Sequence, residues 1–426
     1  MSSFSGGGLE AVARQRLARM ESEQNNPIWI RACSENEVLQ QVRWLEERRQ
    51  AGWDDERLPL YGQFFAVKDN IDVEGVPTTA GCPDYAYLPK EDAPVVRELK
   101  EAGAIFLGKT HMDQFATGLV GTRSPLGPCR NAFNPEYIAG GSSSGSAVAV
   151  ASGMADFSLG TDTAGSGRIP AAFQGLVGYK PSKGLLSTRG VVPACRSLDC
   201  VSLFAKSVQA AESLASICAK FDPLDPYARG REGMPSGLSK KFRFGVPEEL
   251  EFFGDQEARA LFEKACLEME ALGAERVVVD DRSFREAARL LYQGPWVAER
   301  SVAVGEWMRE HPGSCDPVVA SIIAGGQDWK AVDVYRAMHR LEALKREAAR
   351  QWERMDLLFL PTAPTVYTLA QIAQDPFGLN TRLGTHTNFR QSDGSLCPGT
   401  ARRVLGLRGA FWSDGDGTSF SGFAIV

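Results

Sequence analysis

The chain has 426 residues, of which 43% are hydrophobic and 23% charged, and its formal net charge is −6. This length accommodates two or three average domains or one large α/β domain, and the apolar share excludes a wholly disordered chain. The acidic balance argues against a dedicated nucleic-acid binder. No apolar run reaches membrane-spanning length, and residues 1–8 lack the basic and apolar parts of a secretory signal. We therefore expect a cytoplasmic protein with no membrane and no nucleic-acid partner.

Cysteine and histidine usage narrows the chemistry. Nine cysteines are scattered without any C-x-x-C spacing, which argues against a zinc knuckle or a redox dithiol and fits a reduced cytosolic protein. The four histidines form no cluster with metal-ligand spacing, and none adjoins a serine or cysteine motif. A hydrolase built from this sequence would need a general base other than histidine, and we expect no metal and no cofactor.

Predicted helices and strands alternate along the chain. Apolar residues recur at helical spacing from Leu9 to Met20, and a capping box at 34–37 begins a second helix that Gly52 ends. The apolar run at 64–67 predicts the first strand. Further helices are expected over 94–102, 111–117, 148–152, 208–219, 255–272, 284–309 (interrupted at 294–295) and 329–354, and further strands over 104–107, 157–159, 242–246, 276–279 and 357–360. This alternation predicts a layered α/β fold.

Glycine and serine are concentrated in residues 139–170. Three serines there follow a glycine pair, and a second glycine-rich turn follows a strand. Small residues let backbone N–H groups approach a ligand, and such a turn can present several of them to one oxyanion. Upstream, Lys68 ends an apolar strand, where partial burial would lower its pKa and make it a base for a serine nucleophile. Glycine- and serine-rich loops are more often plain turns or phosphate cradles, although neither nucleotide-binding glycine motif is present. A lysine at a strand end is usually solvated, so each feature alone leaves both interpretations open.

Four stretches together are similar to the amidase signature family: GQFFAVKDNIDVEG at 62–75, TTAGCPDY at 78–85, GAIFLGKTHMDQFA at 103–116, and the glycine- and serine-rich segment at 140–172. The resemblance runs from about Leu9 to about Phe389 and implies an α/β fold with a large mixed central β-sheet covered by helices on both faces. It also implies an amidohydrolase with a Ser–cis-Ser–Lys triad. The residues in these roles are Lys68 as base, Ser142 as bridging cis-serine, Ser166 as nucleophile, and the N–H groups of Thr163, Ala164, Gly165 and Ser166 as oxyanion hole.

Within that family, the stretches 113–123, 178–200 and 361–365 resemble the allophanate hydrolases. This resemblance implies hydrolysis of the amide of allophanate (urea-1-carboxylate) to ammonia and carbon dioxide in urea degradation. It also implies a functional link to a biotin-dependent urea carboxylase, and it is compatible with a homodimer. Another amidase, or the A subunit of a tRNA-dependent amidotransferase, is the alternative.

An anionic substrate calls for an arginine, because a guanidinium binds a carboxylate in a bidentate manner. The segment 292–300 resembles the family segment that supplies a substrate-binding tyrosine and arginine, here Tyr292 and Arg300. Gly118 is expected to add a backbone contact to the substrate. Because a glycine and a proline occupy 294–295, we expect the helix to kink or break between the tyrosine and the arginine.

The competing interpretation is that Arg300 pairs with Glu299 or Glu306 on a solvated helix. In that case the substrate carboxylate must be bound elsewhere, and Arg189 and Arg196 are the next candidates.

The resemblance ends abruptly after Phe389. Residues 390–426 are rich in Gly, Ser and Arg and show neither helix nor strand periodicity. We therefore expect an amidase signature domain at 1–389, with N-terminal helices at about 9–52, followed by a poorly ordered tail outside the family pattern. A reading-frame shift near codon 390 would explain the change and leaves an inactive product as an alternative outcome; a divergent C-terminus is the other explanation.

Overall fold

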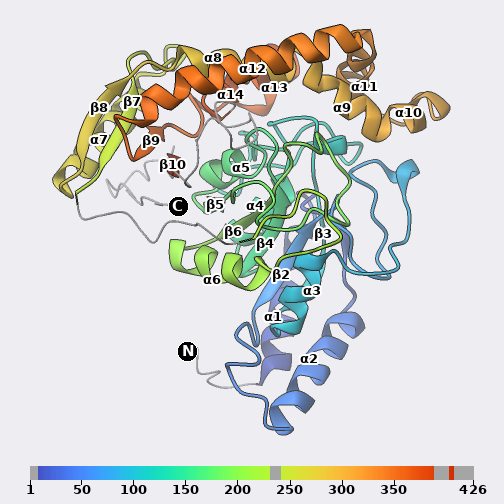
Figure 1. Cartoon of the computed structure of the whole chain (residues 1–426). Helices are drawn as coiled ribbons and strands as arrows, with labels where there is room; N and C mark the ends of the chain where they lie inside the picture. The colour runs from blue at the N-terminus through green and yellow to red at the C-terminus, as the bar shows by residue number, and fades with distance from the viewer. Residues whose placement is uncertain (1–7, 231–240, 388–402, 407–426) are drawn as a thin grey trace.

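A six-stranded mixed sheet forms the centre of the larger part of the molecule (Figure 1). The computed structural model describes residues 8–230, 241–387 and 403–406. Its strands are β1 (Trp29–Ala32), β2 (Phe64–Lys68), β3 (Ile105–Thr110), β4 (Phe157–Thr161), β5 (Val177–Tyr179) and β6 (Val201–Ala205). Their order is β1-β3-β2-β4-β6-β5, with β2 parallel to both of its neighbours and the remaining pairs antiparallel. All five residues of β2 are buried, as expected for a central strand with both faces covered.

Six helices pack around this sheet. The hydrophobic core that they form with it is the largest among the described residues. The helices are α1 (Leu9–Ser22), α2 (Glu35–Gln50), α3 (Pro94–Glu101), α4 (Ser144–Ala151), α5 (Arg168–Phe173) and α6 (Val208–Cys218). The predicted capping box of α2 is present, because Ser34 and Glu37 bond reciprocally to each other's backbone N–H groups. Helix α4 packs on β2, β3 and β4, whereas α6 packs on β5 and β6 and against α3. The predicted mixed sheet with its helical layers is confirmed.

A second, fully parallel sheet follows in the chain and lies at the upper left of Figure 1. Its strands are β7 (Arg243–Pro247), β8 (Glu275–Val279), β9 (Leu357–Leu360) and β10 (Arg403–Gly406), in the order β10-β9-β7-β8. Helices α7 (Gln256–Ala271), α8 (Arg282–Tyr292) and α12 (Ala331–Trp352) supply apolar side chains to its two cores. The shorter helices are α9 (Ala298–Arg300), α10 (Glu306–Glu310), α11 (Pro317–Ala324), α13 (Leu369–Gln374) and α14 (Gly378–Leu383).

The helix predicted at 111–117 is wrong. The chain forms only a 3₁₀ turn at Gln114–Ala116, in which Phe115 has φ 48°. The reason is tertiary: the buried Asp113 carboxylate accepts hydrogen bonds from the backbone of Val120, Gly121 and Arg123, which turns the chain back on itself. A helix would carry those amides away from the carboxylate. The prediction also missed several elements: β1, β5, β6, β10, α5, α11, α13 and α14.

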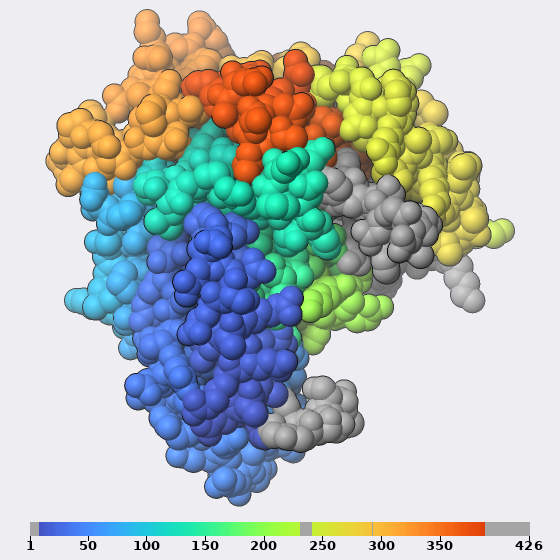
Figure 2. Space-filling view, turned by 180° about the vertical axis from the view of Figure 1, so that it is seen from behind, coloured from blue at the N-terminus to red at the C-terminus, as the bar shows by residue number. Residues whose placement is uncertain are grey.

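The segment at 363–383 packs against loops and helix α5 of the first sheet's part of the molecule. Apolar residues of 363–383 share a core with Leu119, Ile138 and Ile169, and this segment lies on the surface beside the 120–150 region (Figure 2). Of the expected tail, residues 403–406 form β10 despite the lack of strand periodicity, and 388–402 and 407–426 lie outside the described residues. Nowhere in the described ranges is a helix both long and apolar enough to cross a membrane.

Gly145, at the start of α4, tests how tightly the serine-rich segment is packed. An added Cβ would lie 2.3 Å from the Ile28 carbonyl oxygen and 2.6 Å from the His111 nitrogen, and neither backbone atom can move freely. We expect Gly145→Ala to lower the free energy of unfolding by about 1–3 kcal/mol in urea titrations, as overpacked cores do. Gly325→Ala is the control, since nothing lies within 4 Å of its Cβ position and its φ is −59°. Equal stability of the two variants would contradict the close packing of Gly145 against Ile28 and His111.

Candidate active site

The end of β2 and the serine-rich loop meet in the interior of the first sheet. Lys68, the last residue of β2, donates hydrogen bonds of 2.7 Å to both Ser142 Oγ and Thr161 Oγ1. The peptide bond between Gly141 and Ser142 is cis. Thr161 ends β4, and the pairing of β2 with β4 places it beside the lysine. Lys68 and Ser142 have no exposed surface.

The environment of Lys68 favours the neutral amine. Burial lowers the pKa of its ammonium group to about 7, against the opposing effect of the Asp113, Asp199 and Asp162 carboxylates, and the Arg300 guanidinium lowers the pKa further. Near neutral pH a substantial fraction of the side chain is therefore unprotonated and able to accept a proton.

Ser166 lies in the loop of residues 162–166, between β4 and α5, and is 3% exposed. Its Oγ makes a long 3.5 Å contact to the Gly118 carbonyl oxygen, and its own carbonyl accepts the Ser143 N–H at 3.3 Å. The second bond ties the two serine-bearing loops together. Among the described residues, no hydrogen bond joins Ser142 Oγ to Ser166 Oγ in this conformation.

Three of the four backbone N–H groups predicted for the oxyanion hole donate no hydrogen bond to the described part of the chain. Within the part of the chain that the structure describes, the amides of Thr163, Ala164 and Ser166 have no acceptor. The Gly165 amide instead donates to Asp162 Oδ1 at 2.7 Å. The geometry therefore supports Thr163, Ala164 and Ser166 as donors and gives the Gly165 amide a role within the loop.

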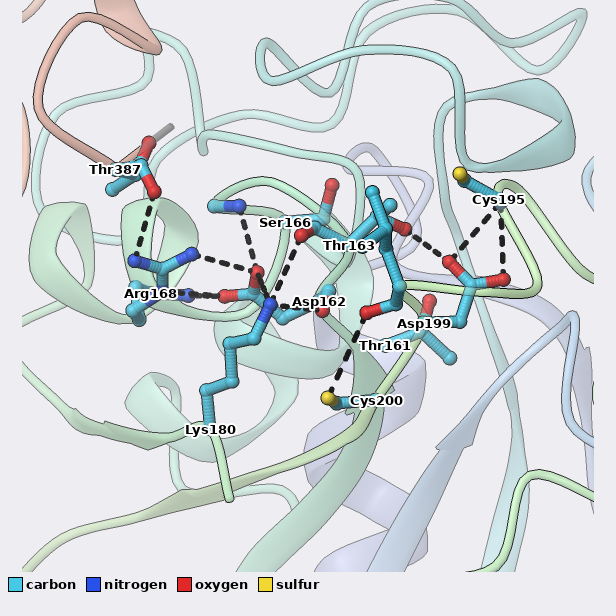
Figure 3. A network of polar contacts seen from close by, with 12 residues as sticks. Thr161, Asp162, Thr163, Ser166, Arg168, Lys180, Cys195, Asp199, Cys200 and Thr387 are labelled. Atoms are coloured by element: carbon cyan, nitrogen blue, oxygen red, sulfur yellow. Dashed lines mark hydrogen bonds and ion pairs between the residues drawn. The ribbon is translucent and has the colours of Figure 1, made fainter. Parts of the chain in front are cut away.

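Asp162 holds this loop through a network of cations (Figure 3). Arg168 Nε lies 2.8 Å from Asp162 Oδ2, Arg168 Nη2 lies 2.9 Å from Oδ1, and Lys180 Nζ lies 3.3 Å from Oδ1. Burial raises the pKa of the Asp162 carboxyl group, but the charges of Arg168 and Lys180 and the loop's hydrogen bonds outweigh it and hold the pKa well below its usual range. Asp162 is thus a fixed anion that organises the turn.

Arg300 is buried, 3% exposed, which excludes the alternative of a solvated helix. Its Nη1 donates to Thr117 Oγ1 at 2.7 Å and makes a 3.5 Å contact to the Ala116 carbonyl. Glu299, the partner proposed in that alternative, instead accepts the Ser197 N–H at 2.8 Å. Arg300 therefore lies next to the segment that precedes Gly118 and acts on the charge of Lys68.

The predicted break between Tyr292 and Arg300 is confirmed, since Tyr292 ends α8 and a 3₁₀ turn at Pro295–Val297 separates it from α9. Of the two reserve candidates, Arg189 forms ion pairs with Glu91 and Asp222, and Arg196 is exposed. Neither therefore takes the place of Arg300 at Thr117.

Several polar partners at the site gave no signal in the sequence. Thr161 binds Lys68, Thr117 binds Arg300, and Asp199 accepts a hydrogen bond from the Thr163 hydroxyl as well as from two backbone amides at 194–195. Lys180 lies inside a stretch that carried the resemblance, but nothing there indicated what it touches. Within the described ranges, no group of three or more His, Cys, Asp or Glu side chains is arranged to hold a metal ion.

Comparison with known proteins agrees with the fold. The amidase family matches residues 11–385, and the chain belongs to that family. Urea amidolyase of Saccharomyces cerevisiae is 44% identical over 387 residues, which are 89% of this chain and 21% of the relative. Allophanate hydrolase of Kluyveromyces lactis has a similar structure, with a TM-score of 0.86 and 41% identity over 91% of this chain and 64% of that one. The predicted amidase signature fold and membership of the amidase family are confirmed.

A relative of a second kind has similar length. The A subunit of glutamyl-tRNA(Gln) amidotransferase from Symbiobacterium thermophilum is 36% identical over 417 residues, which are 88% of this chain and 84% of the relative. The chain thus spans about a fifth of the curated urea amidolyases that it matches and most of a shorter amidotransferase chain.

The charge environment of Lys68 predicts a measurable titration. In protein labelled with ¹³C and ¹⁵N at lysine, we expect the Lys68 side-chain signal, assigned by its loss in Lys68→Met, to titrate with a pKa of about 7. In Arg300→Gln the pKa should rise, because a positive charge that lowers it is removed. Arg289→Gln on the exposed face of α8 is the control and should leave the midpoint unchanged. A wild-type midpoint near the ordinary 10.5 would contradict this account.

Proposed function

We propose that this chain hydrolyses the amide of allophanate. The observation that carries the proposal is the buried Arg300, held by Thr117 beside a serine–lysine site. A guanidinium in this position suits a small substrate with a carboxylate, because an anion that leaves water must be paired. The likeness to urea amidolyase and to allophanate hydrolase supports the same substrate.

The first half of the proposed reaction forms an acyl-enzyme. Neutral Lys68 accepts a proton from Ser142 Oγ, which in turn accepts one from Ser166 Oγ. Ser166 Oγ attacks the terminal amide carbon of allophanate, and the N–H groups of Thr163, Ala164 and Ser166 stabilise the resulting oxyanion. The proton then passes back through Ser142 to the leaving nitrogen, the carbon–nitrogen bond breaks, and ammonia departs.

The second half uses water. Lys68 and Ser142 deprotonate a water molecule, which attacks the acyl carbon and displaces Ser166 Oγ, and the proton returns to the serine. The product is a dicarboxylated amine, which breaks down to ammonia and carbon dioxide. In this scheme Arg300 binds the carboxylate of the substrate, Tyr292 adds a hydrogen bond, and Gly118 contributes a backbone contact near Ser166. We propose no cofactor for the reaction.

The biological setting follows from the substrate. Allophanate is a carboxylated urea, so an enzyme that carboxylates urea must supply it, and we propose a functional link to a biotin-dependent urea carboxylase in the cytoplasm. We further propose that the amidase signature domain covers residues 1–389, and β10 adds residues 403–406 to its second sheet. Bonds of the 361–387 segment to the site, such as Arg168 Nη1 to the Thr387 carbonyl at 3.2 Å, support a domain that includes this segment. We also propose that the protein forms a homodimer, which a measurement of its molecular mass in solution would test.

The alternative is the A subunit of a tRNA-dependent amidotransferase, which the relative from Symbiobacterium thermophilum favours. Such a protein would release ammonia from glutamine instead of allophanate. Ammonia release from the purified chain on allophanate, on glutamine and on a simple carboxamide separates the two functions. Activity on glutamine alone would favour the amidotransferase function, and inactivity on all three would indicate an inactive product.

The triad predicts a graded loss of activity. Ser166→Ala should abolish the acyl-enzyme, and Lys68→Met should lower kcat by several orders of magnitude, because a triad acts as one unit. Ser142→Ala should match them or fall between. Mass spectrometry of the trapped acyl-enzyme and steady-state ammonia release provide the measurements. Ser143→Ala, whose hydroxyl bonds to the Thr161 carbonyl at 3.1 Å, is the matched control and should retain most activity. Substantial turnover in Ser166→Ala would exclude this mechanism.

Arg300 predicts the substrate preference. Arg300→Ala should lose about 2–5 kcal/mol of transition-state stabilisation on allophanate, as expected for a desolvated charge pair that loses one partner. Neutral amides such as malonamide should lose much less, because they never use the charge. Arg300→Lys should still impair the enzyme, since it lacks the planar fork. The measurement is the ratio of kcat/KM for the acidic and the neutral substrate, and an unchanged ratio would move the carboxylate site away from Arg300.

A further inference from the structure

Lys180 is a largely buried lysine that contacts the loop bearing Ser166. It follows β5 directly, and its side chain is only 9% exposed. Its ammonium nitrogen lies 2.8 Å from the Asp162 carbonyl oxygen, 2.9 Å from the Thr163 carbonyl oxygen and 3.3 Å from Asp162 Oδ1 (Figure 3). A lysine has three N–H donors, and these three acceptors occupy them all.

The two carbonyl bonds fix the direction of two amides. The bond between Gly141 and Ser142 is the one cis peptide among the described residues, so the peptides that follow Asp162 and Thr163 are trans. In a trans peptide the C=O and N–H groups point in opposite directions. The N–H groups of Thr163 and Ala164 therefore point away from Lys180, and they are two of the three predicted oxyanion-hole amides for which the described chain provides no acceptor.

We propose that Lys180 is a positioning residue of the oxyanion hole, which holds the peptide planes that present the Thr163 and Ala164 N–H groups to the reacting carbonyl oxygen. The proposal rests on the Ser166 mechanism but not on the identity of the substrate. The ammonium also polarises the two peptides, because hydrogen bonds in series strengthen one another, and this makes their N–H groups better donors. The two carbonyl bonds thus set both the direction and the strength of the donors.

No neighbouring contact duplicates this restraint within the described chain. The guanidinium of Arg168 bonds to the Asp162 carboxylate and to the Thr387 carbonyl, and Asp199 holds the Thr163 side chain, so neither side chain touches the two carbonyl oxygens. The loop itself contains Gly165 at φ 128°, a conformation that L side chains rarely adopt. Without Lys180, no hydrogen bond in the described chain would hold the carbonyl groups of Asp162 and Thr163, and the N–H groups of Thr163 and Ala164 would lose their common direction.

The test is the rate at which a fluorophosphonate modifies Ser166, together with kcat and KM for whichever amide the wild type hydrolyses. Lys180→Met keeps the stem of the side chain and removes the donors. Removing one oxyanion donor typically costs about 10²–10³-fold in kcat, so we expect at least about a 100-fold fall in the phosphonylation rate and in kcat, with KM little changed. Lys183→Met is the matched control, since its ammonium lies over the Tyr227 ring, 5.8 Å from the centroid, and it should react at the wild-type rate.

If Lys180 only stabilised the fold, its substitution would change stability and not the reaction rate of the folded protein. Lys180→Met would then melt at a lower temperature and contain less folded protein, but its folded fraction would react at the wild-type rate, and that result would overturn the proposal. A rise in KM at unchanged kcat would overturn it as well.

If Lys180→Met does not fold, Lys180→Arg provides the test. Its planar guanidinium keeps the charge but cannot direct three donors to acceptors around one point, so kcat should still fall at least about tenfold. A wild-type kcat in Lys180→Arg would refute the proposal. A wild type that is phosphonylated at Ser166 but does not hydrolyse allophanate refutes the substrate and leaves the Lys180 test valid, whereas a wild type that is not labelled refutes both.

Discussion

Burial of the Lys68 amine is the constraint on which the site depends. Moving an ammonium ion out of water costs several kcal/mol, so the fold must either pair this charge or favour its loss. Among the described residues, Lys68 has two hydroxyl partners, Ser142 and Thr161, and its carboxylate neighbours act on it only through their charge. A hydroxyl can accept from an ammonium ion and donate to a neutral amine. Both contacts therefore survive the proton transfer that a general base must undergo.

The pKa of Lys68 is set by a balance of charges at longer range. Three buried carboxylates, on Asp113, Asp199 and Asp162, each raise it, and the buried guanidinium of Arg300 lowers it. Two of these carboxylates also shape the loops of the site. Asp113 accepts hydrogen bonds from backbone amides of 120–123, and Asp162 accepts them from the amides of Gly165 and Arg168. The groups that fold these loops are thus also the groups that adjust the base. A substitution that repairs packing but changes a charge here would alter the pH range of activity.

Sequence reasoning succeeded where the information is local. The buried strand ending at Lys68 and the capping box at Ser34 depend on neighbours within a few residues, and both were predictable. It failed at 111–117, where helical apolar spacing is overridden by the bonds of Asp113 to amides seven to ten residues away. The burial of Arg300 was equally out of reach, since its partner Thr117 lies 183 positions earlier in the chain. Motif resemblance identified the serines and the lysine, but not the partners that orient them.

Arg168 and Lys180 bind different groups of the 162–166 loop, and the chemistry of the two side chains explains the difference. Arg168 presents a planar fork, which matches the two oxygens of the Asp162 carboxylate, whereas Lys180 presents a compact charge with three donors, which suits acceptors that surround one point. Arg168 also bonds to the carbonyl of Thr387, and an added Cβ on Gly165 would lie 2.5 Å from the Thr387 hydroxyl oxygen. The chain as far as Thr387 therefore supports the loop from outside while Lys180 holds its backbone. Residues more than two hundred positions apart thus restrain one turn, which is the precision that an oxyanion hole requires.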